Sequence, residues 1–264
     1  MDRLQIVMLG SGAVATHLGK ALYGQGHRIL QVYSRNLQHA STLSGQVEAE
    51  ALDQLSKLNP KADLYIISVS DQAIAGLVDA LPQTLACVVH TSGSTDIGVL
   101  EGRFSSWGVL YPLQTFSIQR DVDFSKIPIL LEGDRPETES FLKLYMEELS
   151  RQVQLVESQQ RGILHVAAVL ACNFSNHLYA LAQNLLEDHQ LTFDLIRPLI
   201  QETAEKALQH APASVQTGPA IRQDRNTMER HMVLLANRPD LQQLYKYLSE
   251  SIQHNSGENV DDSL

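Results

Sequence analysis

A short apolar segment that runs directly into a glycine-rich turn constrains this chain more than any other feature. Residues 4–9 are mostly apolar, and Gly10-Ser11-Gly12-Ala13-Val14-Ala15 follows them where a helical pattern begins. Glycines at the first two positions permit a tight turn and a close ligand, and the small third residue lets the helix pack on its strand. Free amide groups at the helix start attract an anion. We expect these six residues to bind a dinucleotide pyrophosphate, although glycines also mark ordinary turns.

Composition and charge argue against several classes of protein. A hydrophobic content of 44% and a charged content of 19% are those of an ordinary soluble protein. The net charge of −10 argues against a nucleic-acid partner. The longest apolar stretch, 163–171, is too short to cross a membrane, and the N-terminus does not resemble a signal peptide. Neither Cys87 nor Cys172 has a partner at metal-ligand spacing, so we expect no metal site and a cytoplasmic location.

Strand-like and helix-like segments alternate in the first half of the chain. The predicted strands are 5–9, 28–34, a short one near Val47, 63–69, 86–90, 109–111, 127–131 and 152–156, and the predicted helices are 14–24, 37–43, 51–58 and 72–81. Strands separated by helices form right-handed crossovers in a parallel sheet. We therefore expect an α/β fold, with a doubly wound, mostly parallel Rossmann sheet over residues 1–156.

The pattern changes from Ser158 onward, where strand-like alternation disappears. Four helices are predicted, over residues 159–189, 193–210, 225–237 and 240–253. The last ten residues are polar and acidic. These features predict an all-helical C-terminal domain over residues 157–254, followed by a flexible tail over residues 255–264.

The end of the second predicted strand indicates which dinucleotide is bound. NAD sites usually carry an acidic residue there, which accepts a hydrogen bond from the ribose 2′-hydroxyl. This chain has Ser34 and Arg35 instead, and these residues would bind a 2′-phosphate that a carboxylate would repel. NADP is therefore the predicted cofactor and NAD the alternative. A solvated, non-binding Arg35 is the other reading.

Two later strand ends carry small polar groups toward the same edge of the sheet. Val69 and Ser70 follow one strand, and His90 and Ser92 follow the next. Ligands of open parallel sheets bind beyond the carboxyl ends of the strands, so these four residues are expected to line the cofactor site. His90 could donate to a substrate oxygen or only orient its loop. Asp71 is expected to cap a helix with Ser70 rather than to act in catalysis.

Two polar clusters interrupt the helical half. At about 100° per residue, His165 and Asn176 lie about 20° apart on the predicted long helix, and Asn173 shares their face. This arrangement favours a polar cavity over satisfied core residues. Asp224 and His231 are similarly aligned, and an aspartate beside a histidine raises the basicity of the imidazole. A helix cap with a surface ion pair to Arg222 is the competing interpretation.

The chain resembles a bacterial family of Rossmann-like proteins that have a helical C-terminal domain of unassigned function. The resemblance rests on residues 10–15, 68–71 and 90–94, and above all on Thr217-Gly-Pro-x-x-Arg222-x-Asp224-x-x-Thr227-x-x-x-His231. Such chains are often labelled NADP oxidoreductases of the deazaflavin-dependent type. More distantly, the chain is similar to pyrroline-5-carboxylate reductase, 6-phosphogluconate dehydrogenase and 3-hydroxyisobutyrate dehydrogenase. The resemblance implies a C-terminal domain of the 6-phosphogluconate dehydrogenase type, a substrate cleft between the domains and a homodimer.

One departure from the hydroxyacid dehydrogenases affects the expected chemistry. Those enzymes carry a catalytic lysine one turn before an asparagine that Asn173 matches, but Val169 and Leu170 stand where the lysine would be. His165 or His231 would then exchange the proton, with Asp224 orienting His231 and Arg222 anchoring an acidic substrate.

The sequence as a whole predicts an NADP-dependent oxidoreductase that transfers a hydride between its cofactor and a small carbonyl, imine or hydroxy compound. A non-catalytic NADP-binding sensor or partner protein is the alternative.

Overall fold

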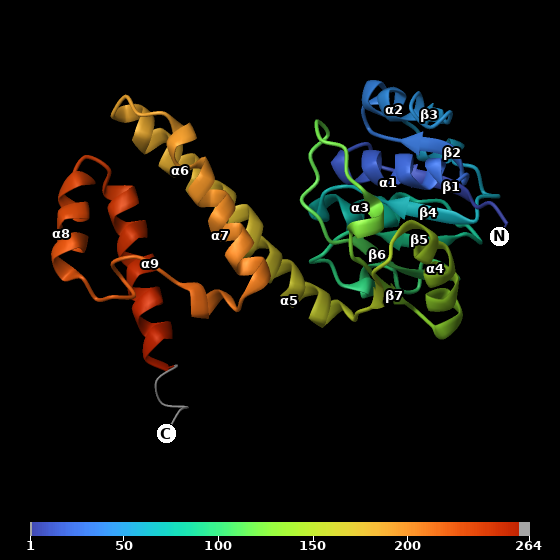
Figure 1. Ribbon diagram of the computed structural model, residues 1–264. Helices are drawn as coiled ribbons and strands as arrows, with labels where there is room; N and C mark the ends of the chain where they lie inside the picture. The colour runs from blue at the N-terminus through green and yellow to red at the C-terminus, as the bar shows by residue number, and fades with distance from the viewer. Residues whose placement is uncertain (1, 259–264) are drawn as a thin grey trace. The chain divides into compact units, whose positions relative to one another are not determined.

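An eight-stranded sheet organises the first part of the chain in a computed structural model that describes residues 2–258 (Figure 1). The strands are β1 (Gln5–Leu9), β2 (Arg28–Tyr33), β3 (Glu50–Leu52), β4 (Leu64–Ile67), β5 (Cys87–His90), β6 (Trp107–Pro112), β7 (Ile129–Gly133) and β8 (Val153–Leu155). Their order is β3-β2-β1-β4-β5-β6-β7-β8, and neighbours are parallel except for β6 and β7. The strand order reverses between β1 and β4, which is where open α/β sheets bind their ligands.

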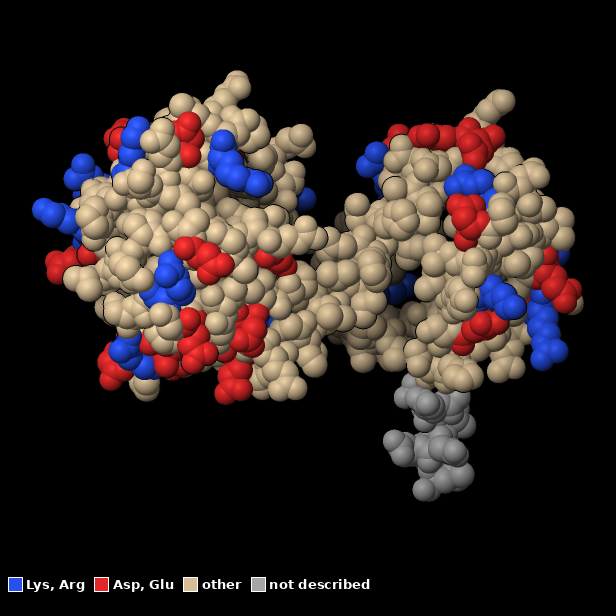
Figure 2. All heavy atoms as spheres, turned by 180° about the vertical axis from the view of Figure 1, so that it is seen from behind, with Lys and Arg blue, Asp and Glu red and all other residues tan. Residues whose placement is uncertain are grey.

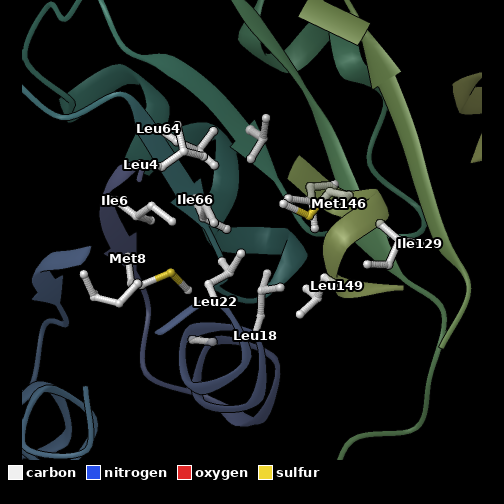
Figure 3. Packing of buried hydrophobic residues seen from close by; sticks show 14 of the residues in the cluster. Leu4, Ile6, Met8, Leu18, Leu22, Leu64, Ile66, Ile129, Met146 and Leu149 are labelled. Atoms are coloured by element: carbon white, nitrogen blue, oxygen red, sulfur yellow. The ribbon is translucent and has the colours of Figure 1, made fainter. Parts of the chain in front are cut away.

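Helices cover both faces of this sheet, which confirms the predicted doubly wound α/β fold. The helices of this part are α1 (Ala13–Gly24), α2 (Leu37–Ser44), α3 (Asp71–Ala80) and α4 (Pro136–Leu149). Side chains of α1, α2 and α4 share one buried cluster with alternate residues of the strands, such as Ile6 and Met8 (Figure 3). The intervening residues, Val7 and Leu9, face a second cluster that includes residues of α3. Burial on both faces explains why the central strands are apolar at nearly every position.

Two predictions near the sheet edge were wrong. Val47 is not in a strand but in a turn after α2, where its side chain is buried. The helix predicted over 51–58 is replaced by β3 and a short 3₁₀ helix, Leu55–Lys57. Pairing of β3 with β2 overrides the local helical pattern, because it places Leu52 in the core.

Helix α4 was not predicted, although the sequence carries the usual signals for it. Pro136 stands at its first turn together with Glu137 and Glu139, and acidic residues there are favoured by the helix dipole. Leu142, Met146 and Leu149 recur at helical spacing and are buried.

The remainder of the chain is helical. The helices are α5 (Ser158–Ala168), a π-helical segment (Val169–Phe174), α6 (Ser175–Asp188), α7 (Arg197–Gln209), α8 (Arg225–Leu234) and α9 (Pro239–Glu258). The single long helix predicted over 159–189 thus contains a wider turn. This turn invalidates the constant rotation of about 100° per residue that aligned His165 with Asn176.

The chain divides into two compact units. The first unit extends from Met1 to Asn173 and the second from Phe174 to Leu264, so the division falls within the π-helical segment. The domain limits at 156 and 254 stay predictions. Of the tail expected over 255–264, residues up to Glu258 continue α9 and the rest lie outside the described residues. None of the helices described is long and apolar enough to span a bilayer.

The two units differ in how much apolar surface they bury. Between Phe174 and Glu258, Ala220 and Leu235 are the buried hydrophobic residues in the described part of the chain. Large exposed apolar side chains in this unit are Phe174, Leu191, Leu195, Leu199, Leu208, Val233, Leu234, Tyr247 and Leu248. Charged side chains of both signs are scattered over each unit in the view of Figure 2.

Candidate functional site

The turn between β1 and α1 is shaped to receive an anion. Gly10 has a φ of +127°, and a Cβ there would collide with the carbonyl of Ser68, so only glycine fits. A Cβ at Gly12, in contrast, would meet no atom within 4 Å. Gly12 is the N-cap of α1, no side chain caps the helix, and its first turn has no acidic residue. Open space in front of free amide groups fits a phosphate.

A cavity of about 780 Å³ opens beside this turn at the carboxyl edge of the sheet in the first unit. Its walls are residues 10–14, 33–35, Leu55, residues 68–71, part of α3, residues 91–93, Tyr111, Pro112, Gln114, Phe116 and His165. Of the residues predicted to bind the cofactor, Gly10, Ser11, Gly12, Ala13, Val14, Ser34, Arg35, Val69, Ser70 and Ser92 line it. Ala15 and His90 do not, because both are fully buried. The volume falls in the range of roughly 300–1,000 Å³ typical of small-molecule sites.

The end of β2 brings a free cation to this cavity. Arg35 is exposed, and within residues 2–258 no ion pair or hydrogen bond engages its guanidinium. The Ser34 hydroxyl accepts a 3.3 Å hydrogen bond from the backbone of Asn36, whose side chain caps α2. No carboxylate stands among the cavity residues of this strand end. The segment can therefore receive a 2′-phosphate on Ser34 and Arg35.

Asp71 links two loops of the cavity instead of capping α3. It is the first residue of that helix, and its carboxylate accepts a short hydrogen bond from the Ser94 hydroxyl. Ser70 occupies the N-cap position but makes no capping bond with its side chain. The negative charge of Asp71 is still well placed, since it lies at the positive end of the helix dipole.

His90 orients the loop after β5, which is one of the two roles that the sequence left open. Its Nδ1 accepts a 3.2 Å hydrogen bond from the backbone of Ser92, and the side chain is fully buried. Burial, with a smaller contribution from the Arg161 charge, lowers the pKa of His90 to about 4. The ring is thus neutral near pH 7 and does not line the cavity.

Tyr111 is a cavity residue that sequence reasoning missed. It lies near the end of β6, and its Oη is 3.1 Å from Nδ1 of His165 on α5. The two rings meet edge to face, with their centroids 6.1 Å apart. Burial raises the pKa of Tyr111, and the Asp71 charge adds to the effect, so its hydroxyl keeps its proton near neutrality. The predicted His165 therefore has a protonated partner in the cavity.

A buried arginine holds the start of α5 against the sheet. Arg161 is 1% exposed and forms an ion pair with Glu132 at the end of β7. It also donates to the carbonyl of Thr95 at 2.6 Å and to the Ser158 hydroxyl at 2.9 Å. His165 is one helical turn further along and on the same face as Arg161. This network, which the sequence analysis missed, fixes the position from which His165 reaches the cavity.

The predicted residues of the second unit form different contacts from those expected. The Asp224 carboxylate caps α8 by accepting hydrogen bonds from the backbone and the hydroxyl of Thr227, at 3.1 and 2.7 Å. These two bonds lower the pKa of Asp224. Nδ1 of His231 is 2.8 Å from the hydroxyl of Tyr245. No bond between Asp224 and His231 is among those of the described residues, so the expected orientation of His231 by Asp224 was wrong.

Two further predicted residues are exposed. Asn173 lies in the π-helical segment at the end of the first unit, and Arg222 lies in the turn before α8. In the described part of the chain neither side chain takes part in an ion pair or a side-chain hydrogen bond. The described residues also contain no group of three or more histidine, cysteine or acidic side chains able to hold a metal.

Comparisons with known proteins agree with this architecture. Residues 1–113 match the profile of a Rossmann-like domain, and residues 127–252 match a domain of unknown function, DUF2520. A crystal structure of a candidate NADP oxidoreductase from Bacteroides fragilis is 46% identical, with a TM-score of 0.89 over 96% of this chain and 98% of that one. The chain belongs to the Rossmann-like DUF2520 family.

More distant relatives share the fold of this family. A reductive aminase from Aspergillus terreus, solved with NADPH and ethyl levulinate, is 16% identical with a TM-score of 0.69, and covers 97% of this chain and 96% of its own. A pyrroline-5-carboxylate reductase from Coxiella burnetii is 15% identical with a TM-score of 0.57, over 97% and 98% of the two chains. No curated protein sequence matches the chain.

Proposed function

We propose that this chain is an NADP-dependent oxidoreductase that interconverts a small carbonyl or imine compound and its reduced form. The observation that carries the proposal is one cavity whose walls include both the turn at residues 10–14 and the side chains of Tyr111 and His165. The name of the B. fragilis relative, at 46% identity over nearly the whole chain, supports the same activity and the same cofactor.

The residues present fit NADP better than NAD. Gly10 allows the tight turn, Gly12 leaves the approach to the backbone open, and the start of α1 offers free amides for the pyrophosphate. Ser34 and Arg35 stand where an NAD site would carry a carboxylate. An unpaired guanidinium can donate two parallel hydrogen bonds to a phosphate.

The chemistry divides between the cofactor and the chain. When bound, the dihydronicotinamide supplies two electrons as a hydride, and the chain supplies position, exclusion of water and a proton. His165 is the predicted proton-exchanging residue that lines the cavity. No lysine occurs between Lys143 and Lys206, so the lysine chemistry of the hydroxyacid dehydrogenases is not available on this helix.

The same absence of lysine favours a second candidate, a non-catalytic NADP-binding sensor. One experiment separates the two functions. Purified chain is titrated with NADPH and NADH by calorimetry, and NADPH consumption is then followed with a panel of keto acids, aldehydes and imines. Binding with turnover is expected. Binding without turnover on any panel member would favour the sensor, and absence of binding would refute both.

We further propose that the substrate carries a carboxylate. Arg222, which is exposed, is proposed to anchor the substrate carboxylate, with Asn173, Asp224 and His231 as further contributors. The panel tests this by pairing each keto acid with its ester. Arg222→Lys should raise KM for the acid and not for the ester, and equal KM changes for both would remove the assignment.

We also propose that the chain forms a homodimer through its second unit. The exposed apolar side chains of that unit, such as Leu199 and Leu208, would be covered by a second copy. Sedimentation equilibrium should give twice the mass of the chain.

A cytoplasmic location is proposed because Cys87 and Cys172 are free thiols, as is usual in a reducing compartment. Fractionation of cells that express the chain tests it.

A further inference from the structure

We propose that Tyr111 delivers the proton to the substrate and that His165 replaces it through Nδ1, so that the two residues form a proton relay. The inference rests on the proposed oxidoreductase function and assigns the final donor to a residue that the sequence did not suggest. Its basis is the 3.1 Å contact between Tyr111 Oη and His165 Nδ1 inside the cavity.

Gly93 lies directly against the two side chains that form this contact. A Cβ at Gly93 would lie 2.6 Å from Nδ1 of His165 and 2.8 Å from Cζ of Tyr111. The loop after β5 therefore packs directly against the edge at which the two rings meet, and only a residue without a side chain fits there. Within residues 2–258, the Tyr111 oxygen is the polar atom within hydrogen-bond distance of Nδ1, so a proton on Nδ1 can move directly to it.

The position of Tyr111 suits a final donor. Its side chain is 9% exposed, whereas that of His165 is half-buried on α5. A shielded hydroxyl at the carboxyl edge of the sheet exchanges protons with a bound substrate more readily than with bulk water.

The proton balance of the relay is complete in the direction of reduction. The Tyr111 Oη–H bond breaks as its proton bonds to the substrate oxygen or nitrogen, while the Nδ1 proton of a protonated His165 passes to Oη. Bound NADPH would supply the two electrons of the reduction as a hydride, so the chain has to supply one proton. His165 ends neutral, with Nδ1 accepting a hydrogen bond from Tyr111, and Tyr111 never has to hold a full negative charge.

The charged groups around the pair are compatible with this role. Asp71 on α3 disfavours a tyrosinate, because its negative charge raises the pKa of Tyr111. Arg161 on α5 acts in the opposite direction and lowers the pKa of Tyr111, but its effect is smaller than those of burial and Asp71, and His90 behind the loop is neutral. The net field at the pair therefore opposes loss of the Tyr111 proton unless another proton replaces it.

Two variants test the relay with the full-length protein. Tyr111→Phe removes only Oη and should lower kcat for NADPH-dependent reduction about a hundredfold or more, with the NADPH affinity unchanged within threefold. Gly93→Ala removes no functional group but separates the rings, and should also lower kcat at least tenfold. Gly162→Ala is the matched control. Gly162 is on the helix that carries His165, and a Cβ there would meet no atom within 4 Å.

A readout independent of turnover examines the pair itself. In the apo protein labelled with ¹⁵N-histidine, the His165 signal is assigned by its loss in His165→Gln. Nδ1 of neutral His165 should show the shift of a hydrogen-bonded acceptor in the wild type and lose it in Tyr111→Phe.

The outcomes separate the relay from the function on which it rests. If no substrate supports NADPH consumption by the wild type, the proposed function fails and the relay fails with it. If NADPH is consumed but Tyr111→Phe retains kcat within threefold, the relay alone is refuted and Nε2 of His165 becomes the donor. An unchanged Nδ1 shift in Tyr111→Phe would refute the pair regardless of rates.

Discussion

The two units of this chain solve the burial of apolar side chains in different ways. In the first, two clusters cover both faces of the sheet, and residues such as Ile66 are fully buried. In the second, leucines of similar size remain more than half exposed, including Leu199 at 63% and Leu208 at 86%. The first unit contains its own hydrophobic core, whereas the second leaves apolar area that water contacts unfavourably. Stability and ligand binding are therefore expected to depend on the first unit, and self-association on the second.

The largest contrast should come from removing one arginine in each unit. Arg161→Leu leaves the largely buried carboxylate of Glu132 without its cation and with only the hydrogen bonds from Ser158, and we expect a loss of about 3 kcal/mol in the free energy of unfolding. Arg197→Leu breaks an exposed pair with Asp194 and should cost about 0–1 kcal/mol. Urea denaturation of both variants measures the difference. Equal losses would show that burial does not distinguish the two ion pairs.

The stability of the first unit should also depend on pH through His90. Its pKa is about 4 in the folded chain, against an ordinary value of 6.5. As the pH falls, His90 of the unfolded chain is therefore protonated before His90 of the folded chain. The free energy of unfolding decreases as the pH falls from 6.5 to 4. We expect a loss of about 3 kcal/mol from this residue.

The variant His90→Asn isolates that effect, because its side-chain oxygen can still accept from the Ser92 backbone. Denaturation midpoints of the wild type and the variant at pH 7 and pH 4.5 give the comparison. A variant that loses as much stability on acidification as the wild type would assign the effect to other groups.

Replacing Arg35 tests directly whether the first unit binds the cofactor. Arg35→Ala removes the free cation at the end of β2 and should weaken NADPH binding by about 1.5–3 kcal/mol, or ten- to a hundredfold, with NADH binding unchanged. Calorimetric titration of both nucleotides decides this. A parallel loss for NADH would place Arg35 on a part of the cofactor that both nucleotides share.

The smallest expected effects concern exposed leucines. Leu199→Ser in the second unit should weaken self-association about tenfold, while Leu85→Ser, at an 89% exposed site in the first, should leave it unchanged. Sedimentation velocity at several concentrations measures both. Association that is equally sensitive to the two changes would contradict the proposed dimerisation through the second unit.

The local sequence pattern predicted correctly those strands that are buried over most of their length. β1, β2, β4 and β5 lie within a few residues of their predicted limits, because their apolar runs are buried on both faces. The pattern failed around 47–58, where pairing with β2 decided the structure. It also aligned His165 with Asn176 on one regular helix, which the intervening π-helical segment invalidates.

The sequence by itself determined the turn at residues 10–15 and the polar end of β2, since both depend on neighbours only a few positions apart. The tertiary structure alone decided that Tyr111 meets His165, 54 residues later, and that His231 pairs with Tyr245 rather than with Asp224. The spacing of residues along one strand or helix determines the direction in which each side chain points from that element. Which side chains meet across elements depends on how the elements pack, and that is settled by burial and hydrogen bonding of the whole unit.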